Sequence, residues 1–486
     1  MVGALEYSAF IPQLERMSVI AWFTPPRRIA LVGLVVMVAA AGAAVSLRTR
    51  THADVFARAT ASPVEVQRLD KELATWERAS GIDPYSAMFP AHAAALHLQR
   101  GRLTGDYADA IAAERLSRQS LAQRTQHNGA AFVTLAAALL EQHRFIEANQ
   151  IARQLVTGQP DVDAYYSLLG ETELELGDYD AARASFAAVR QPMSGLSTMA
   201  GIARWSELQG NERVALALLR KAREAARRRP GEMKEEIAWY YMREADIDLR
   251  SGRVNAAAEA LAAGLAIAPS DYRLLAARAR LAAARGEWRD AATYGEASTF
   301  NVLDPTTLVV VATAYGELGD TAKAAEAERA AAAAVSGQAG TLHRAWAMYE
   351  LDRNRNVDSI AARARRELAA RHDVYTLDVL AWAEFTSGHA FEARRHMRDA
   401  LRIGTKDPVF FYHAGFIEIA AGDTIKGEAL LSRALQLDAN STPHYVRSAR
   451  VLLDRIDAAR DNRRAFPSRT AARARRALRA LTRHEG

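Results

Sequence analysis

Twelve scattered histidines are the first side chains to consider for metal binding, because the chain contains no cysteine. The absence of cysteine excludes disulfides, thiolate metal sites and a thiol nucleophile. His389 and His396 lie seven residues apart and could share one helical face, and His92 and His97 form a second pair. A solvent-exposed pair would show the same spacing, so we predict no metal site.

Other catalytic signatures are also missing from the sequence. It contains no G-x-x-x-x-G-K-[ST], no H-E-x-x-H, no G-x-S-x-G and no glycine-rich turn opening a helix after a strand. Once the elements described below are assigned, no stretch of about 100 residues remains for a catalytic domain. We therefore predict no enzyme activity, no catalytic residues and no cofactor.

A repeated pattern organises most of the chain. In LELGDYDAARASF (174–186), a glycine separates two helical stretches, and a small residue is followed four positions later by a large one. The turn position returns mostly at spacings of 33 or 34, and the fifth residue after it is Ala in eight of nine copies. The turns are Gly105, His143, Gly177, Gly210, Gly252, Gly286, Gly319, Gly388 and Gly422. The 69-residue gap after Gly319 predicts a degenerate copy around 350–362.

Each copy predicts a helix-turn-helix hairpin. Glycine suits the turn because it adopts positive φ without a Cβ clash, and His143 should strain its own turn. The alanine allows the second helix to approach the first closely, and the large residue fills the space beside it. Prolines near 160, 269, 305 and 408 mark boundaries between copies.

The period, the glycine turn, the small-then-large pair and the proline boundaries resemble the tetratricopeptide repeat (TPR) family. The resemblance covers residues 88–440, about ten copies. The copy at 164–189 matches the family pattern best and also has the family's Leu-Gly pair, at Leu169-Gly170. It implies an all-α fold, a right-handed solenoid of helix-turn-helix repeats. A helical array of another type, such as HEAT, is the alternative.

In TPR proteins the first helix of each repeat lines a concave groove that binds a peptide or a partner helix. The resemblance therefore implies a protein or peptide partner and places eight groove residues on first helices. FFYHAGF (410–416) makes the C-terminal part aromatic, and we expect an exposed aromatic patch there. The eight partner-binding candidates are Trp239, Met242, Arg273, Arg280, Tyr375, Trp382, Tyr412 and Phe416.

Residues 29–47 carry no charge over nineteen positions and follow a flank at 1–28. A helix of that length spans roughly 28 Å, enough for a hydrocarbon core. We expect a transmembrane helix or signal anchor, with a cleaved signal peptide and a buried core helix as the alternatives. Arginines flank both sides equally, so the positive-inside rule does not decide the orientation. We expect a bacterial inner-membrane protein with periplasmic repeats, the alternative being repeats that face the cytoplasm.

The remaining segments are 48–87, a linker and leading helix, and 441–486, a capping helix and a basic tail. Residues 447–486 hold twelve arginines against four acidic residues. The tail either contacts anionic lipid or nucleic acid or is a solvated end of the solenoid. Because arginine outnumbers lysine 57 to 6 in the whole chain, this richness is partly compositional.

Together these features predict a non-catalytic, membrane-anchored scaffold that binds a partner on its concave face. The alternatives are a constitutive structural subunit of a membrane protein complex and a secreted TPR protein with a cleaved signal peptide.

Overall fold

The computed structural model describes residue 55 and residues 64–193, 195–229, 234–337, 342–437 and 443–465. Two compact units divide the chain, Met1–Phe56 and Ala57–Gly486, and every described residue except Val55 belongs to the second. The expected membrane span at 29–47 and the tail beyond residue 465 lie outside the described residues. Within the described ranges, no helix combines the length and the apolar character needed to cross a bilayer.

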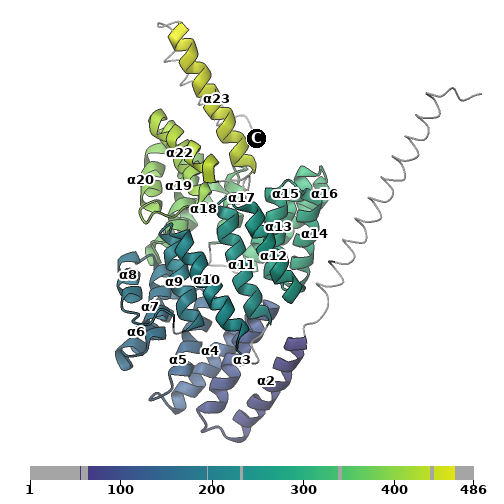
Figure 1. The fold of residues 1–486 in the computed structure, drawn as a ribbon, viewed down its shortest axis with the longest axis vertical. Coiled ribbons are helices and arrows are strands. Elements are labelled where there is room, and N and C mark those ends of the chain that lie inside the picture. Colours follow the sequence, from purple (N-terminus) through teal and green to yellow (C-terminus); the bar gives the residue numbers. More distant parts are fainter. Residues whose placement is uncertain are drawn as a thin grey trace, which may run out of the picture. The chain divides into compact units, whose positions relative to one another are not determined.

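The described ranges are all-helical and form ten hairpins between a leading helix, α2 (Val64–Ile82), and a final helix, α23 (Pro443–Ala465) (Figure 1). The first five hairpins are α3 (Met88–Thr104) with α4 (Tyr107–Gln123), α5 (Gly129–Glu141) with α6 (Phe145–Gly158), α7 (Asp163–Leu176) with α8 (Tyr179–Ala187), α9 (Leu196–Leu208) with α10 (Glu212–Arg227), and α11 (Lys234–Arg250) with α12 (Val254–Ile267). The other five are α13 (Tyr272–Ala284) with α14 (Trp288–Asn301), α15 (Pro305–Glu317) with α16 (Thr321–Gly337), α17 (Arg344–Leu351) with α18 (Val357–Ala370), α19 (Val374–Thr386) with α20 (Ala390–Ala400), and α21 (Pro408–Ala420) with α22 (Thr424–Leu437). The architecture is a TPR-like helical solenoid, as the repeat pattern predicts.

The hairpin turns depend on the left-handed backbone conformation. All eight turn glycines have positive φ, for example +74° at Gly177 and +72° at Gly286. His143 keeps the same conformation with φ +56°, although a Cβ makes it unfavourable. The hairpin α17–α18 occupies the stretch expected to hold a degenerate copy, and Asn354 and Asn356 supply its positive φ values. Asparagine tolerates this conformation better than most residues.

Packing inside a hairpin follows the small-then-large pair. Ala182 has no exposed surface, and Phe186 lies against Gly170 of the facing helix, where an added Cβ would come within 2.8 Å of the ring. The alanines at the equivalent position are buried in seven hairpins, at residues 110, 148, 182, 215, 257, 291 and 393. The alanine therefore sets how closely the two helices approach.

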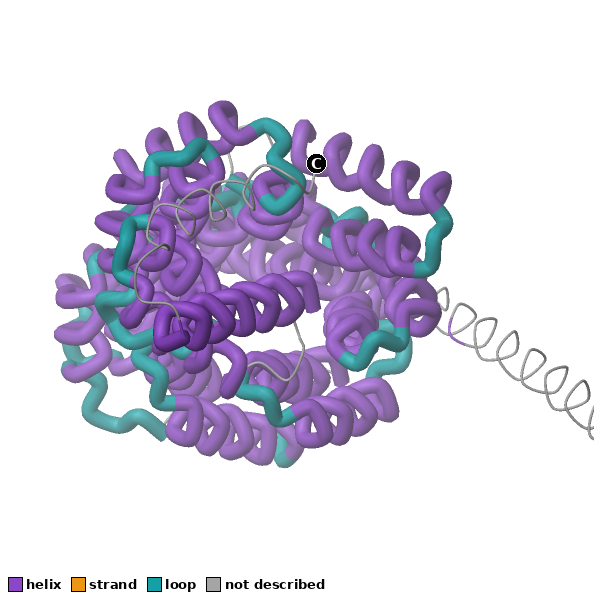
Figure 2. Tube along the Cα trace, turned by 90° about the horizontal axis from the view of Figure 1, so that it is seen from above, coloured by secondary structure: helices purple, strands orange, loops and turns teal. Residues whose placement is uncertain are grey.

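The first helices of the hairpins form the inner layer of the solenoid. Most neighbouring first helices pack against one another, as α7 does with α9 and α11 with α13, whereas no two neighbouring second helices make comparable contact. A curved stack is more crowded on its inner side, so the first helices line that side. Figure 2, seen from above, shows the hairpins wound about a common axis.

The solenoid curves so tightly that its successive superhelical turns touch. The amide of His372 donates to the carbonyl of Leu176 over 2.8 Å, and the amide of Val374 donates to the Tyr179 hydroxyl over 2.9 Å, across 195 residues. One hairpin further on, Thr405 Oγ1 donates to the Leu208 carbonyl over 2.7 Å, across 197 residues. The contacting hairpins, α7–α8 and α19–α20, are six hairpins apart, so six hairpins make up one superhelical turn. We call this line of contacts the seam.

The seam uses the glycine tips of the hairpins. A Cβ added at Gly177 would lie 2.3 Å from the carbonyl carbon of His372, and one at Gly210 would lie 2.6 Å from the carbonyl oxygen of Gly404. A Cβ at Gly105 would meet the side chain of Val302 at 2.3 Å. By contrast, an added Cβ at Gly286 meets nothing within 4 Å. At three tips, glycine therefore satisfies both the local turn and the contact with the next superhelical turn.

We predict that Gly177→Ala destabilises the fold more than Gly286→Ala. Both substitutions force a Cβ into the left-handed region, at about 1–2 kcal/mol. Only Gly177→Ala also drives that Cβ into backbone atoms, which adds a further ~1–3 kcal/mol for overpacking. Urea denaturation midpoints followed by circular dichroism measure the difference. Equal midpoints for the two variants would show that the seam does not stabilise the solenoid.

Candidate partner-binding surface

A ladder of ion pairs links the first helices of four consecutive hairpins. Glu175 on α7 pairs with Arg204 on α9 at 2.5 Å, and Glu207 on α9 pairs with Arg243 on α11 at 2.6 Å. Asp246 on α11 then pairs with Arg280 on α13 at 2.7 Å. We call this set, together with Glu171 and Arg250, the inner ladder.

The ladder side chains are reached by water even though they lie on the inner layer. The exposed fraction is 43% for the Arg204 side chain, 31% for Arg280 and 22% for Arg243. Partly exposed ion pairs typically contribute only about 0–1 kcal/mol to stability. Their charges can therefore be shared with a partner at little cost to the fold.

The electrostatics of the ladder are uneven. Burial alone would raise the pKa of the Glu175 carboxyl, but the charges of Arg204 and Arg371 outweigh it and the pKa is lowered. Burial raises the pKa of Glu171 to about 7, although the nearby Arg204 opposes this. An added Cβ at Gly201 would lie 2.6 Å from both the Glu171 carboxylate and Ser167 Oγ. The missing side chain at residue 201 therefore leaves room for the Glu171 carboxyl.

The next superhelical turn faces the ladder across the seam. Arg250 pairs with Glu207, and both line a narrow cavity with Tyr375, Thr405 and Asp407. The Tyr375 ring lies 4.9 Å from the Arg344 guanidinium, and Arg344 pairs with Asp378 at 2.9 Å. The inner surface thus brings together side chains of two superhelical turns. A prediction made one repeat at a time could not show this.

Five of the predicted groove residues lie on this half-buried inner layer. Trp239 packs edge-on against Tyr240 with ring centroids 5.1 Å apart, and Met242 packs against the apolar core around Leu274. Arg273 bonds to Asp271, the N-cap of its own helix, while Arg280 and Tyr375 make the contacts described above. Nothing in the structure tests whether these five residues bind a partner, so that role remains a prediction.

The expected exposed aromatic patch is not observed at its two central residues. Tyr412 has no exposed surface and Trp382 retains 7%, while Phe416 is half-buried against the same core. Helix α23 covers them, because Tyr445 stacks on Tyr412 with centroids 5.7 Å apart and meets Trp382 edge-on at 5.9 Å. The prediction of exposure was wrong because it did not place α23.

A buried polar chain beneath α23 was missed at the sequence level. His413 Nδ1 lies 2.6 Å from Asp378 Oδ1, and His413 Nε2 lies 2.8 Å from the Tyr445 hydroxyl, which donates to Asp352 over 2.7 Å. His413 and Asp378 have no exposed surface. Burial alone would raise the Asp378 pKa, but His413 and Arg344 lower it. The available signal was a histidine inside the apolar stretch FFYHAGF.

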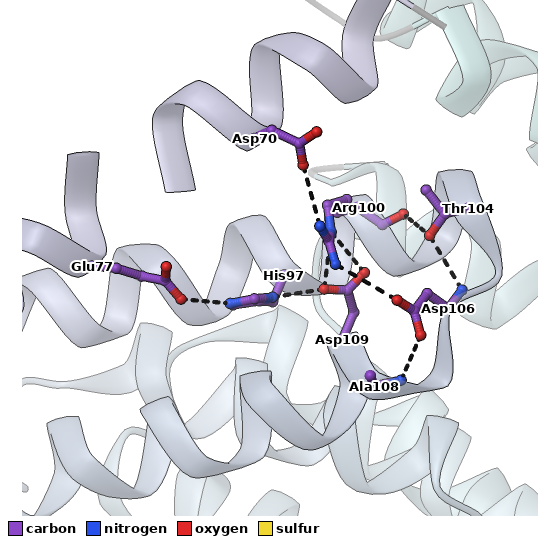
Figure 3. A network of polar contacts seen from close by, with 8 residues as sticks. All are labelled: Asp70, Glu77, His97, Arg100, Thr104, Asp106, Ala108 and Asp109. Atoms are coloured by element: carbon purple, nitrogen blue, oxygen red, sulfur yellow. Dashed lines mark hydrogen bonds and ion pairs between the residues drawn. The ribbon is translucent and has the colours of Figure 1, made fainter. Parts of the chain in front are cut away.

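The N-terminal end has a comparable polar network, which Figure 3 shows. Asp109 on α4, almost fully buried, lies 2.7 Å from His97 and 3.0 Å from Arg100. These two side chains reach α2 through Glu77 at 3.2 Å and Asp70 at 3.2 Å. The network therefore fastens the leading helix to the first hairpin.

The other histidines suggested by the sequence also have structural contacts. The His92 ring packs against Trp76 in a tilted arrangement with centroids 4.6 Å apart, and His396 bonds to Glu384 at 2.7 Å. Across the part of the chain that the structure describes, no group of three or more histidine or acidic side chains could hold a metal ion.

A cavity of about 920 Å³ lies at the seam beside the second hairpin turn. His143, Arg144, Phe145 and Arg371 are among its lining residues. Arg144 is held by Glu114 and Glu147, and Arg371 by Glu175 and Asp373. These two arginines therefore already have acidic partners.

Comparisons with known proteins identify no close relative. No protein-family model matches the chain, and no curated protein matches it. Among solved structures, the APC/C hetero-tetramer Cut9–Hcn1 is similar at 12% identity, with 85% of this chain and 93% of that one covered and a TM-score of 0.42. The human IFIT1 dimer with PPP-AAAA is similar at 14% identity, with 76% and 87% covered and a TM-score of 0.42.

We predict that Glu171→Gln stabilises the chain at pH 8 relative to wild type, and much less at pH 5. An unfolded glutamate ionises near pH 4.3, whereas the folded-state pKa of Glu171 is about 7. The folded chain therefore binds more protons in this interval, and wild-type stability falls as pH rises through it. Glutamine does not ionise, so the difference between the two chains should grow by on the order of 1 kcal/mol.

Urea denaturation at both pH values measures this difference, and Glu259→Gln at an exposed site on α12 controls for the loss of a surface charge. A difference that stays constant between pH 5 and pH 8 would mean that Glu171 is ionised throughout.

Proposed function

We infer that this chain is a non-catalytic interaction scaffold that binds a segment of a partner protein along its inner surface. The observation that carries this proposal is the inner ladder. It offers alternating acidic and basic groups on consecutive first helices, and these groups are partly exposed. A partner segment can exchange its own charges and backbone groups for those of the ladder.

The ladder favours specificity over raw affinity. Complementary charges steer a partner and fix its register, while like charges exclude others. Tyr375 and Arg344 supply an aromatic ring and a guanidinium beside the ladder, and these groups anchor interfaces well. Trp239 and Met242 add half-buried apolar surface on the same layer.

The proposal includes a membrane tether at residues 29–47, supported by the uncharged nineteen-residue stretch in the sequence. In this arrangement the chain is a bacterial inner-membrane protein, and the solenoid collects a partner close to the membrane, on the periplasmic side. A constitutive subunit of a membrane complex would use the same surfaces with a permanent partner.

Site-specific photo-crosslinking in cells that naturally express the chain tests the inner face. A photoreactive residue replaces Arg280 on α13 or Arg289 on the outer helix α14 of the same hairpin. We expect a discrete crosslinked polypeptide from position 280 and none from position 289. The same products from both positions, or none from 280, would contradict binding on the inner face.

A second variant separates binding from folding. Arg243→Ala leaves Glu207 paired with Arg250, so the free energy of unfolding should fall by about 1 kcal/mol or less. Loss of an interface arginine should reduce crosslinking from position 280 by about tenfold, equivalent to ~1.4 kcal/mol. Unchanged crosslinking would remove the ladder from the binding surface.

A further inference from the structure

Helix α23 packs against both helices of the last hairpin, α21 and α22, and its first turn reaches the inner face of α17 and α19, where a partner helix would dock. Figure 1 shows it at the C-terminal end beside α17, α19 and α22. Tyr445, Val446, Ala449 and Ile456 of α23 are at most 8% exposed and share one core with α19 and α21. A segment of the same chain therefore covers the aromatic side chains Trp382 and Tyr412 that the repeat pattern assigned to a partner-binding groove.

The polar contacts of α23 reach across the solenoid. The Tyr445 hydroxyl and His444 Nε2 bond to the two carboxylate oxygens of Asp352 at 2.7 and 2.9 Å, across 93 and 92 residues. Arg447 pairs with Glu317 on α15 at 3.1 Å, across 130 residues. Helix α23 thus contacts α15 and α17 as well as the hairpins that immediately precede it.

We propose that the inner face of α17, α19 and α21 is a helix-binding groove and that α23 is its displaceable intramolecular occupant. A partner helix takes the place of α23, so the groove is closed until that partner arrives. This regulation rests on the proposed scaffold function but concerns a different part of the inner surface from the ladder.

The composition of the interface supports displacement. On the part of α23 whose side chains the structure describes, four apolar side chains are buried and Leu452 and Leu453 pack half-buried against the same core, while His444, Tyr445 and Arg447 add polar contacts. His413, Asp378 and Asp352 gain water when α23 leaves, so the groove exchanges protein hydrogen bonds for water hydrogen bonds. Interfaces that separate and reform are more polar than permanent ones, for this reason.

Helix α23, which fills the groove from within the same chain, shows what chemistry the groove recognises. It holds a tyrosine hydroxyl between His413 and Asp352, a donor from the neighbouring residue on Asp352, and a small residue four positions after the tyrosine, Ala449. The fitting partner is a helix that presents a tyrosine, a preceding histidine or basic residue and a small apolar residue one turn later.

Hydrogen exchange of the unmodified full chain provides the first test. Amides of residues 445–456 should exchange through an opening at least tenfold more frequent than that of α21, whose helix remains folded when α23 leaves. If α23 and α21 exchange through one common opening, α23 is a permanent part of the solenoid and the proposal is wrong.

The second test uses a fluorescent peptide of residues 443–465 as the probe. The full chain carrying Tyr445→Ala and Val446→Asp should bind this peptide at least tenfold more tightly than wild type, because its own α23 no longer holds the groove. The matched control is Val451→Asp, at a residue of α23 that is 48% exposed, and it should bind as wild type does. Adding His413→Ala to the double variant should abolish the gain.

Peptide binding that is no tighter in the double variant overturns the proposal. So does a gain that survives His413→Ala, since the peptide then binds elsewhere. Circular dichroism shows whether the double variant retains its helices, and if it does not, the hydrogen-exchange result decides. Neither experiment uses the partner of the proposed scaffold. Failure of the crosslinking test would therefore contradict the proposed function without deciding whether α23 is displaceable.

Discussion

The contact between the tip of one hairpin and the loop before another, six hairpins later, is the constraint on which the rest of this solenoid depends. At Gly177 the two backbones approach so closely that no side chain fits between them. The His372 amide and the Tyr179 hydroxyl complete hydrogen bonds across the same gap. Repeat solenoids are usually stabilised by neighbouring repeats alone. Here, contacts about 195 residues apart add a second direction of packing.

The seam explains the character of the inner surface. Because successive superhelical turns touch, the first helices α7, α9 and α11 face residues of α19 and of α21 or the loop before it, as well as one another. Charged groups in that position lose part of their hydration, and this raises the pKa of Glu171 while arginines hold that of Glu175 down. The pairs remain partly exposed, so they are suited to recognition more than to stabilisation. This balance underlies the proposal that a partner binds along the ladder.

The two ends of the array are closed by similar chemistry. At each end a buried aspartate, Asp109 or Asp378, holds a histidine and an arginine. These networks fasten α2 at one end and α23 at the other. Polar contacts are directional and fix the orientation of the end helix. They lose less free energy than apolar contacts when the helix separates and water replaces the protein partners. This property of polar contacts underlies the proposal that α23 is displaceable.

The period, the glycine turns and the small-then-large pair were sufficient to predict the all-helical fold and its hairpins, because these depend on residues within about 34 positions of one another. The sequence also placed Arg280 and Tyr375 on first helices. It could not show that Trp382 and Tyr412 are covered, since α23 that covers them carries no repeat signature. Nor could the sequence show the seam, because it identifies Gly177 as a turn residue and gives no sign of its contact with the next superhelical turn. The curvature of the whole array decides which charges meet across two superhelical turns. That curvature is a small rotation per hairpin, summed over six hairpins, and only the tertiary structure shows the sum.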